Sequence, residues 1–261
     1  MIVNTDPFKR FIEIWLYLML LLIILIVFVG GLTRLTDSGL SITEWELFKG
    51  IFPPSNKETW IFYFDLYKQI PEYKEINYNM SLAEFKVIYY WEYAHRLIAR
   101  LIGLFAIVPL ILIYFKFKDR LTSDLKFFSI FALICFQGFL GWFMVKSGLI
   151  NNLDVSHFRL ASHLSVALIV LSIIFWFILQ NLNIPKFNNK INNKFLIFFF
   201  VVIVTQIILG AFLAGLNGGL LYNSWPDMNG NFLADDISSD DLYNLKSLSN
   251  PSVVQFYHRL V

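Results

Sequence analysis

Charged residues are scarce in this sequence. Only 15% of its 261 residues are Asp, Glu, Lys or Arg, against about 25% in an ordinary soluble domain. The apolar set makes up 57% of the chain, and the mean hydropathy is +0.61. A soluble fold of this length cannot bury so much apolar surface and keep a polar exterior. The composition excludes a disordered chain and a typical cytosolic enzyme, and it predicts an all-α, polytopic helical bundle in a membrane.

Cysteine is nearly absent. Cys135 is the single cysteine and lies within an apolar run, so neither an intramolecular disulfide nor a thiolate zinc cluster can form. We expect it to be a small buried hydrophobic residue. The formal net charge is only +2 and no basic tract is present, so we expect no nucleic-acid partner.

Long uncharged runs predict the membrane spans. A helix that crosses a bilayer needs about 20 mostly apolar residues. Runs near that length cover residues 14–32, 127–145, 160–182 and 195–222. A fifth run, 101–115, reaches spanning length only if its helix also includes residues 91–100, which are partly charged. The first run lacks the small-residue cleavage site of a signal peptide, so we expect it to be a retained helix.

Basic residues in the connections predict the orientation. They cluster before the run 14–32, between the runs 101–115 and 127–145, and between the runs 160–182 and 195–222. These residues are Lys9, Arg10, Lys116, Lys118, Arg120, Lys126, Lys186, Lys190 and Lys194. If the spans alternate, all three clusters share one side, which the positive-inside rule makes cytoplasmic together with the amino terminus. The other side receives the connections 33–90, 146–159 and 223–251. Residues 253–261 are too few to cross a bilayer, so we expect the sequence to be a fragment or a truncated frame.

An internal repeat is present. GGLTRLTDSGLSITEW, from Gly30, aligns with GAFLAGLNGGLLYNSW, from Gly210, at a constant offset of 180. After each following connection, YAHRL at 93–97 matches FYHRL at 256–260. We expect two related halves, 1–190 and 191–261, with functional sites in equivalent positions. The alternative is an old duplication of a helix hairpin that preserves no chemistry.

Three of the four histidines lie near the expected outer ends of spans. These are His95, His163 and His258. An imidazole within a span usually faces the bundle interior, and two helices with one histidine each at the same depth can hold a haem iron from both sides. His157 precedes His163 by six residues, about 240° around a helix, so we expect it to be interfacial or at the edge of a substrate. The alternative for each histidine is a hydrogen bond at the membrane interface.

Glu92 is the sharpest single feature. It precedes His95 by three residues and Arg96 by four, which places all three along one helical face. A carboxylate at the membrane margin is costly unless it is paired or functional. Two interpretations stay open, an ion pair with Arg96 or a catalytic group. Gln255 occupies the equivalent position in the second half, so we expect the first half to react and the second only to bind.

Arginines also lie at the expected outer ends of the spans. They are Arg96, Arg100, Arg159 and Arg259. They can extend to the lipid headgroups, or they can pair with carboxylates of a ligand such as haem propionates. For the second role Arg96 and Arg159 are our candidates.

Four segments resemble the haem A synthase family, in the form shared by proteobacteria and mitochondria. They are GGLTRLTDSGLSITEW, YYWEYAHRLIAR, FRLASHL and QFYHRLV, and the resemblance extends over nearly the whole chain. It implies two pseudo-symmetric four-helix bundles, of which this chain has five spans and the start of a sixth. The resemblance also implies a membrane oxidoreductase that takes part in the assembly of cytochrome oxidase. Such an enzyme oxidises the C8 methyl of haem O to a formyl group and so makes haem A for terminal oxidases.

The resemblance also implies roles for single residues. His95 and His163 would bind the iron of the substrate haem, Glu92 would be the essential acidic residue beside it, and His258 would be one axial ligand of a haem b. Two departures are visible. Residues 33–90 contain none of the cysteines that some members have there, which excludes a thiol step. The seventh and eighth spans, with the second haem b ligand, are also missing from the sequence.

The implied setting is the bacterial inner membrane, with the haem sites toward its outer side and lipid around the bundle. Haem O would come from a haem O synthase, while the electron donor is not identified. Gly138 and Gly141 are candidate contacts between helices, so a homo-oligomer is left open. Two alternatives belong to other classes. A haem b electron-transfer protein would bind haem b in both halves, and a proton-coupled transporter that uses Glu92 and the histidines as a relay would bind no haem.

Overall fold

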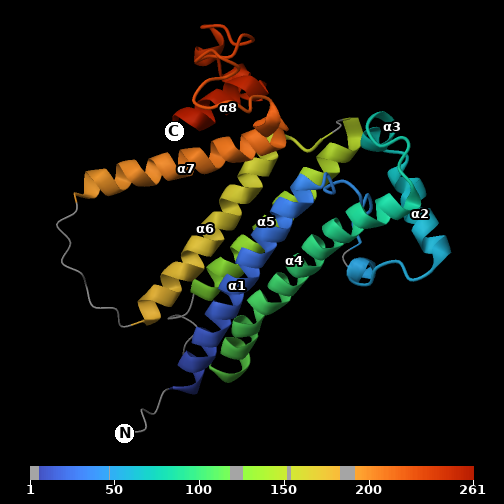
Figure 1. Cartoon of the computed structure of the whole chain (residues 1–261). Helices are drawn as coiled ribbons and strands as arrows, with labels where there is room; N and C mark the ends of the chain where they lie inside the picture. The colour runs from blue at the N-terminus through green and yellow to red at the C-terminus, as the bar shows by residue number, and fades with distance from the viewer. Residues whose placement is uncertain (1–5, 47, 118–125, 152–153, 183–191) are drawn as a thin grey trace. The chain divides into compact units, whose positions relative to one another are not determined.

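The computed structural model describes residues 6–46, 48–117, 126–151, 154–182 and 192–261 (Figure 1). This described part contains helices and no strands, which confirms the all-α fold. It forms two compact units. The first unit is Met1–Asp154 with Val166–Pro185, and the second unit is Val155–Ser165 with Lys186–Val261. Four of the basic residues used to predict the orientation lie outside the described residues: Lys118, Arg120, Lys186 and Lys190.

Among the described residues, five helices are long and apolar enough to cross a membrane, as predicted. They are α1 (Pro7–Leu35), α4 (Leu82–Lys116), α5 (Lys126–Asn151), α6 (His157–Asn181) and α7 (Asn193–Gly215). Helix α4 includes the partly charged stretch 91–100, as its length required. Helix α7 ends at Gly215 rather than near residue 222, because Asn217 adopts a left-handed conformation (φ 53°) that terminates the helix.

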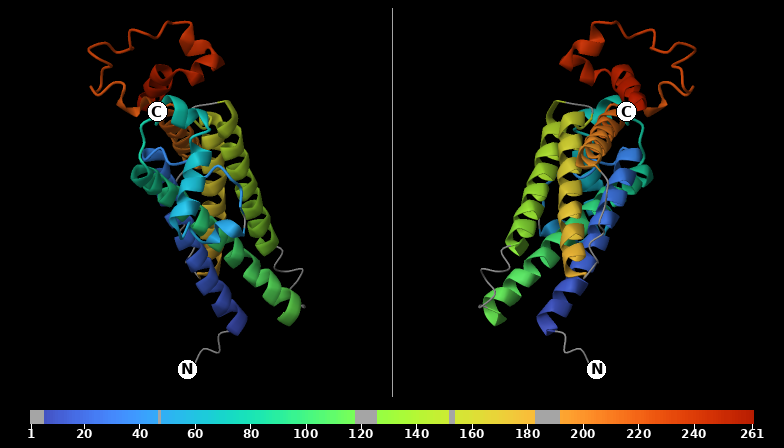
Figure 2. Two further views of the ribbon diagram at one scale, coloured as in Figure 1. Left: turned by 90° about the vertical axis from the view of Figure 1, so that its right-hand side faces the viewer. Right: turned by 90° about the vertical axis from the view of Figure 1, so that its left-hand side faces the viewer.

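The first unit is a bundle in which α1 and α4 lie side by side, with α5 against α4 (Figures 1 and 2). Its core is mostly aliphatic, with a few aromatic residues, and Leu16, Met19, Ala106 and Ile130 are fully buried within it. The indole nitrogen of Trp15 donates a hydrogen bond of 2.7 Å to a backbone carbonyl oxygen of α4. This packing fixes the level of α1 along α4, which matters because both helices carry residues of the site.

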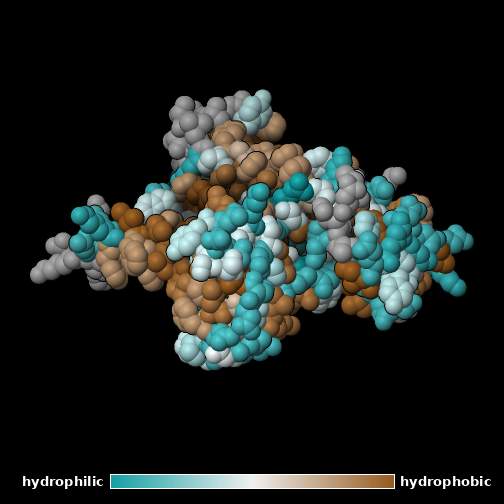
Figure 3. Space-filling model, turned by 90° about the horizontal axis from the view of Figure 1, so that it is seen from above, coloured by the Kyte–Doolittle hydropathy of each residue, from teal (hydrophilic) through white to brown (hydrophobic). Residues whose placement is uncertain are grey.

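The connection between α1 and α4 has its own small core. It contains η1 (Lys49–Ile51), α2 (Lys57–Tyr67) and α3 (Pro71–Glu75). Phe64 and Tyr67 of α2 pack on Phe85 of α4, with ring centroids 4.9 and 5.3 Å away. Polar side chains gather on the outer surface near α2 (Figure 3). The connection is therefore a folded cap on α4.

Helix α4 begins where its sequence dictates. Ser81 accepts a hydrogen bond from the backbone N–H of Glu84, and the Glu84 carboxylate accepts one in return from the backbone N–H of Ser81. This reciprocal capping box satisfies donors that the first turn of a helix leaves unpaired. The start of α4 is therefore defined by local sequence, and residues 91–100 follow about three turns later.

The second unit consists of α7, the first turns of α6, and a connection that leads to α8 (Pro251–Leu260). The connection contains η3 (Gly218–Leu220), η4 (Asp241–Tyr243) and η5 (Leu245–Ser249). This unit has two hydrophobic clusters. One includes Leu209, Phe212 and Val254, and the other packs the connection on α8 and includes Met228 and Phe256. Asn250 caps α8 by accepting a hydrogen bond from the backbone N–H of Ser252, as expected of an asparagine just before a helix.

Cys135 is exposed, so the prediction that it is buried was wrong. Helix α5 is apolar on all sides, and the same outward face carries Phe136, Phe139 and Phe143. When every face of a helix is apolar, hydropathy cannot distinguish the side that packs on the bundle from the side that meets lipid. A single residue inside such a run therefore cannot be assigned to the core from sequence.

Candidate functional site

Glu92 lies on α4 and is buried, with 3% of its surface exposed. Its Oε1 accepts hydrogen bonds from Nε (2.9 Å) and Nη2 (2.6 Å) of Arg96. Its Oε2 accepts from Oγ of Ser41 (2.7 Å) and from the backbone N–H of Ile42 (2.8 Å). Each carboxylate oxygen therefore has two donors, which meets its full accepting capacity. The ion pair with Arg96 is present, and the same carboxylate holds the segment that follows α1.

Arg96 binds that segment as well. Its Nη2 donates to the carbonyl oxygen of Ile42 (2.7 Å) and its Nη1 to that of Glu44 (3.1 Å). Together with the two bonds to Glu92, these contacts use four of the five N–H groups of a guanidinium. The guanidinium also lies 5.7 Å from the centre of the Trp45 ring, within reach of a cation–π contact. Glu92 and Arg96 thus fasten residues 41–45 to α4.

The second unit has an equivalent set of bonds from an arginine to backbone carbonyl groups, and we call each such set a clamp. Arg259 on α8 donates from Nη2 to the carbonyl oxygen of Tyr222 (2.5 Å), and from Nη1 to those of Ser224 (2.9 Å) and Asp227 (2.8 Å). Tyr222 and Ser224 follow Ile42 and Glu44 by 180 positions, the offset of the sequence repeat. Equivalent arginine nitrogens therefore bind equivalent carbonyl groups in the two units.

The helix ends that precede the clamps also match. Asp37 (φ 46°) and Asn217 (φ 53°) are left-handed residues two positions after the ends of α1 and α7, again 180 positions apart. The preceding backbone N–H groups, of Thr36 and Leu216, bond to the carbonyl oxygens four residues before them. The sequence repeat is therefore a repeat of backbone geometry.

The carboxylate of the first unit has an amide counterpart in the second. Gln255 is buried (4% exposed), and its Nε2 donates to the carbonyl oxygen of Tyr222 (3.1 Å). Its Oε1 is buried without a hydrogen-bond partner among the described residues. Glu92 accepts from the backbone of Ile42, whereas Gln255 donates to the backbone of Tyr222, the residue equivalent to Ile42. The first unit therefore has a buried charge where the second has a neutral group.

Two histidine rings pack against glycines. A Cβ atom at Gly30 of α1 would lie 2.9 Å from Cε1 of His95 on α4. A Cβ atom at Gly210 of α7 would lie 3.2 Å from Cε1 of His258 on α8. Gly30 and Gly210 are also 180 positions apart. In each unit the imidazole therefore rests on bare helix backbone.

The other predicted site residues lie on the first turns of α6. His157 packs its ring on Phe158 and Phe212, with centroids 4.1 and 5.5 Å away, and this contact joins α6 to α7. Arg159 and His163 follow on the same helix and are half-buried. These α6 residues belong to the second unit, together with His258. His95 belongs to the first unit, so the structure does not bring it and His163 into one unit.

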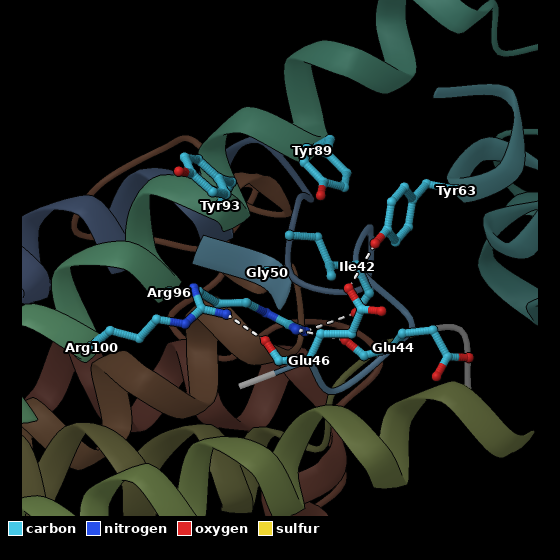
Figure 4. Close-up of a pocket in the computed structure, with 9 residues that line it drawn as sticks. All are labelled: Ile42, Glu44, Glu46, Gly50, Tyr63, Tyr89, Tyr93, Arg96 and Arg100. Atoms are coloured by element: carbon cyan, nitrogen blue, oxygen red, sulfur yellow. Dashed lines mark hydrogen bonds between the residues drawn. The ribbon is translucent and has the colours of Figure 1, made fainter. Parts of the chain in front are cut away.

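A small pocket adjoins the first clamp (Figure 4). At its wall the Tyr63 hydroxyl donates to Oε2 of Glu46 (2.7 Å), and Nη2 of Arg100 donates to the carbonyl oxygen of Glu46 (2.9 Å). The Tyr93 hydroxyl donates to the carbonyl oxygen of Ile51 (2.6 Å). Burial, together with the hydrogen bond to Glu46, raises the pKa of Tyr63 to about 12. These contacts fix the far end of the clamped segment.

The sequence is similar to known proteins over nearly its whole length. The family model described as "Cytochrome oxidase assembly protein" matches residues 13–261. A "Heme A synthase" of Pelagibacter ubique is 60% identical over 99% of this chain and 77% of its own length. The chain belongs to the haem A synthase family. "Heme A synthase" proteins of Rickettsia bellii and Agrobacterium fabrum are 46% and 43% identical, covering 94% and 97% of the chain and 74% and 70% of their own lengths. No solved structure matches the chain.

Some residues of this haem A synthase family member were missed by sequence reasoning. Ser41 and Ile42 bind Glu92 from about fifty positions away, and Glu46 binds Tyr63 across a loop and a helix. Serine and isoleucine in a connection carry no signal of such a role. The constant offset of 180 was a usable signal for Ile42, because it pairs that residue with Tyr222 in the other half.

Proposed function

We propose that this chain is a haem A synthase, a membrane oxidoreductase that converts the C8 methyl of haem O to a formyl group and so supplies haem A to terminal oxidases. The methyl-to-formyl change removes four electrons and adds one oxygen atom. Side chains alone do not supply this redox chemistry, so the protein has to hold haem. The observation that carries the proposal is the repeated unit of glycine, histidine and arginine clamp in a chain of this family.

The haem ligands we propose are three histidines. His95 and His163 would bind the iron of the substrate haem in a first half, residues 1–190, and His258 would bind a haem b in a second half, residues 191–261. His95 and His258 fit such a group. The Nδ1 atom of His258 is buried without a hydrogen-bond partner among the described residues, as expected of an atom that binds a haem iron. The ring of His95 lies beside Gly30, where no side chain covers the helix backbone. A bound haem b would supply electron transfer.

Glu92 is our candidate for the catalytic residue. Its negative charge is buried, and it lies one turn before His95 on α4. A charge held in this way can stabilise positive charge that develops while the methyl group is oxidised, or it can take up a proton. The neutral Gln255 at the equivalent position supports the view that only the first half reacts.

The clamps would orient the histidines. Arg96 and Arg259 each bind two or more carbonyl groups ahead of their helices, which fixes the helix turn that carries His95 or His258. Arg159 is our candidate to pair with a haem propionate, because a guanidinium matches a carboxylate in shape and charge. Arg96 is also a candidate to bind a propionate. It would do so through its fifth N–H group, because the other four donate to protein atoms.

The protein would work in the bacterial inner membrane. We propose a cytoplasmic amino terminus and haem sites toward the outer side, supported by the basic residues at the start of α1 and at the start of α5. A haem O synthase is the expected source of haem O.

Identification of the bound pigments tests the proposal. The protein is purified from membranes of a host that makes haem O, and its haems are extracted, separated and weighed by mass spectrometry. We expect haem b together with haem O and haem A. Haem b alone, with added haem O left unchanged, would indicate an electron-transfer protein, and a preparation without Soret absorbance would indicate a transporter. Either result would overturn the proposal.

A further inference from the structure

Gly30 of α1 lies close to the imidazole of His95, the candidate haem ligand of the first unit. A methyl group in place of its hydrogen would lie 2.9 Å from Cε1 and 3.2 Å from Nδ1 of His95. Contacts below 3.0 Å do not persist, so the imidazole would have to rotate or shift. The neighbouring Gly31 has nothing within 4 Å of the same position. The need for glycine therefore arises from the histidine ring and not from general crowding on α1.

Gly210 shows the same relation in the second unit. A methyl group there would lie 3.2 Å from Cε1 and 3.8 Å from both ring nitrogens of His258. The contact is tighter than ordinary van der Waals distance but looser than at Gly30. Gly219, also in the second unit, has nothing within 4 Å. A glycine therefore lies against a histidine ring in both units, at positions 180 apart, and the distance is shorter at Gly30 than at Gly210.

We infer that Gly30 and Gly210 are positioning residues that set the rotation and depth of the two haem-ligating imidazoles. The inference rests on the proposed function, because it takes His95 and His258 as haem ligands. Each glycine lets the Cε1 atom of the ring come close to α1 or α7, while the arginine one residue after the histidine holds the turn in place. The glycine limits where the ring can lie and the arginine limits the position of the helix turn that carries it, as outer contacts orient a metal ligand.

A haem iron responds to such confinement. The plane and tilt of an axial imidazole affect the ligand field, the midpoint potential and the affinity for the haem. Loss of an outer contact to a metal ligand typically weakens binding about 10–100-fold. Because the contact at Gly30 is closer than that at Gly210, a methyl group should disturb His95 more than His258.

The test compares Gly30→Ala and Gly210→Ala with the matched control Gly31→Ala. Each protein is purified with its haem b and then titrated with haem O, and the readouts are haem affinity, the electron paramagnetic resonance spectrum and the midpoint potential of each haem. We expect Gly30→Ala to weaken haem O binding about tenfold and to leave the haem b spectrum unchanged. Gly210→Ala should shift the haem b spectrum and potential and leave haem O affinity unchanged. Gly31→Ala should match the original protein in every readout.

Each result decides the inference. If Gly30→Ala matches Gly31→Ala, and Gly210→Ala keeps the original haem b spectrum, the inference is overturned. If Gly30→Ala fails to fold, Gly210→Ala decides by the same criterion, with haem O affinity reporting an intact first half. If the original protein binds no haem, the proposed function has failed, and that outcome is distinct from a glycine variant that keeps an unaltered haem.

Discussion

Glu92 joins two parts of the chain that are far apart in sequence. It anchors Ser41 and Ile42 of the connection after α1 while it pairs with Arg96 on its own helix. A buried carboxylate with four donors is held firmly, since a charge-assisted hydrogen bond contributes about 1.5–3 kcal/mol when it is formed inside a protein. Anchoring and catalysis are therefore both open to this residue, and variants have to separate them.

Glu92→Gln should abolish haem A formation and spare haem O binding. The amide has no charge to stabilise the reaction, and we expect a loss of at least about 100-fold, the low end of a general acid–base contribution. The amide also presents an N–H group to donors that already point at this position, namely those of Ser41, Ile42 and Arg96. Haem A produced and haem O bound per mole of protein are measured in parallel.

Ser41→Ala is the control for anchoring. It removes one of the four hydrogen bonds to Glu92 and leaves the negative charge. We expect haem A formation within a few-fold of the original and a small loss of thermal stability. If Ser41→Ala loses as much activity as Glu92→Gln, or if Glu92→Gln loses haem O binding as well, the role of Glu92 is anchoring and its assignment as catalytic is wrong.

At the scale of elements, the helices were predictable because the bilayer requires long apolar runs and because caps are local. Ser81 and Glu84 define the start of α4, and the charged stretch 91–100 had to belong to that helix for it to reach spanning length. The connection after α1 was not predictable. Its small core depends on aromatic contacts between α2 and α4, which no spacing along the chain reveals.

Glu72 of α3 gives this connection a pH-dependent stability. It is buried (6% exposed), and its Oε1 accepts a hydrogen bond from the Tyr67 hydroxyl (2.8 Å). Burial raises the pKa of Glu72 from 4.5 to about 7. The folded state therefore binds the proton more tightly than the unfolded state, so stability falls as pH rises from about 4.5 to about 7 and is then constant.

Glu72→Gln should remove that dependence. Its amide oxygen can still accept from Tyr67, and the side chain cannot ionise. Relative to the original protein the variant should gain up to about 3 kcal/mol above pH 7, since each unit of pKa corresponds to about 1.4 kcal/mol. Thermal unfolding of the protein in detergent between pH 5 and 8 measures this, with Glu75→Gln, an exposed neighbour, as the control. A Glu72→Gln melting curve with the same pH dependence as the original would contradict the assignment.

At the scale of the whole molecule, the two units share one local plan. Each has a transmembrane helix that ends in a left-handed residue, a connection clamped by an arginine, and a histidine that rests on a glycine. The sequence repeat predicted which residues of the two units are equivalent, because the offset of 180 is the same at the helix end and in the connection that follows it. It could not predict what the arginines bind, because backbone carbonyl groups accept hydrogen bonds whatever their side chains are.

The shared plan needs both connections on the same side of the membrane, and cysteine labelling tests this. With Cys135→Ala as background, the chain has no other thiol, and Cys135 is exposed on α5, so its loss should cost little. Ser55→Cys and Ser239→Cys then report on the two connections, and Asn193→Cys reports on the basic side at the start of α7. All three original residues are exposed.

An impermeant maleimide added to intact spheroplasts should label Ser55→Cys and Ser239→Cys but not Asn193→Cys, which should react only after the membrane is opened. The physical reason is the positive-inside rule, because Lys194 and the other basic residues resist transfer across the membrane. If the two connection variants differ in labelling, the equivalence of the units across the bilayer fails. If Asn193→Cys alone is labelled, the orientation is inverted, and the haem sites would then face the cytoplasm.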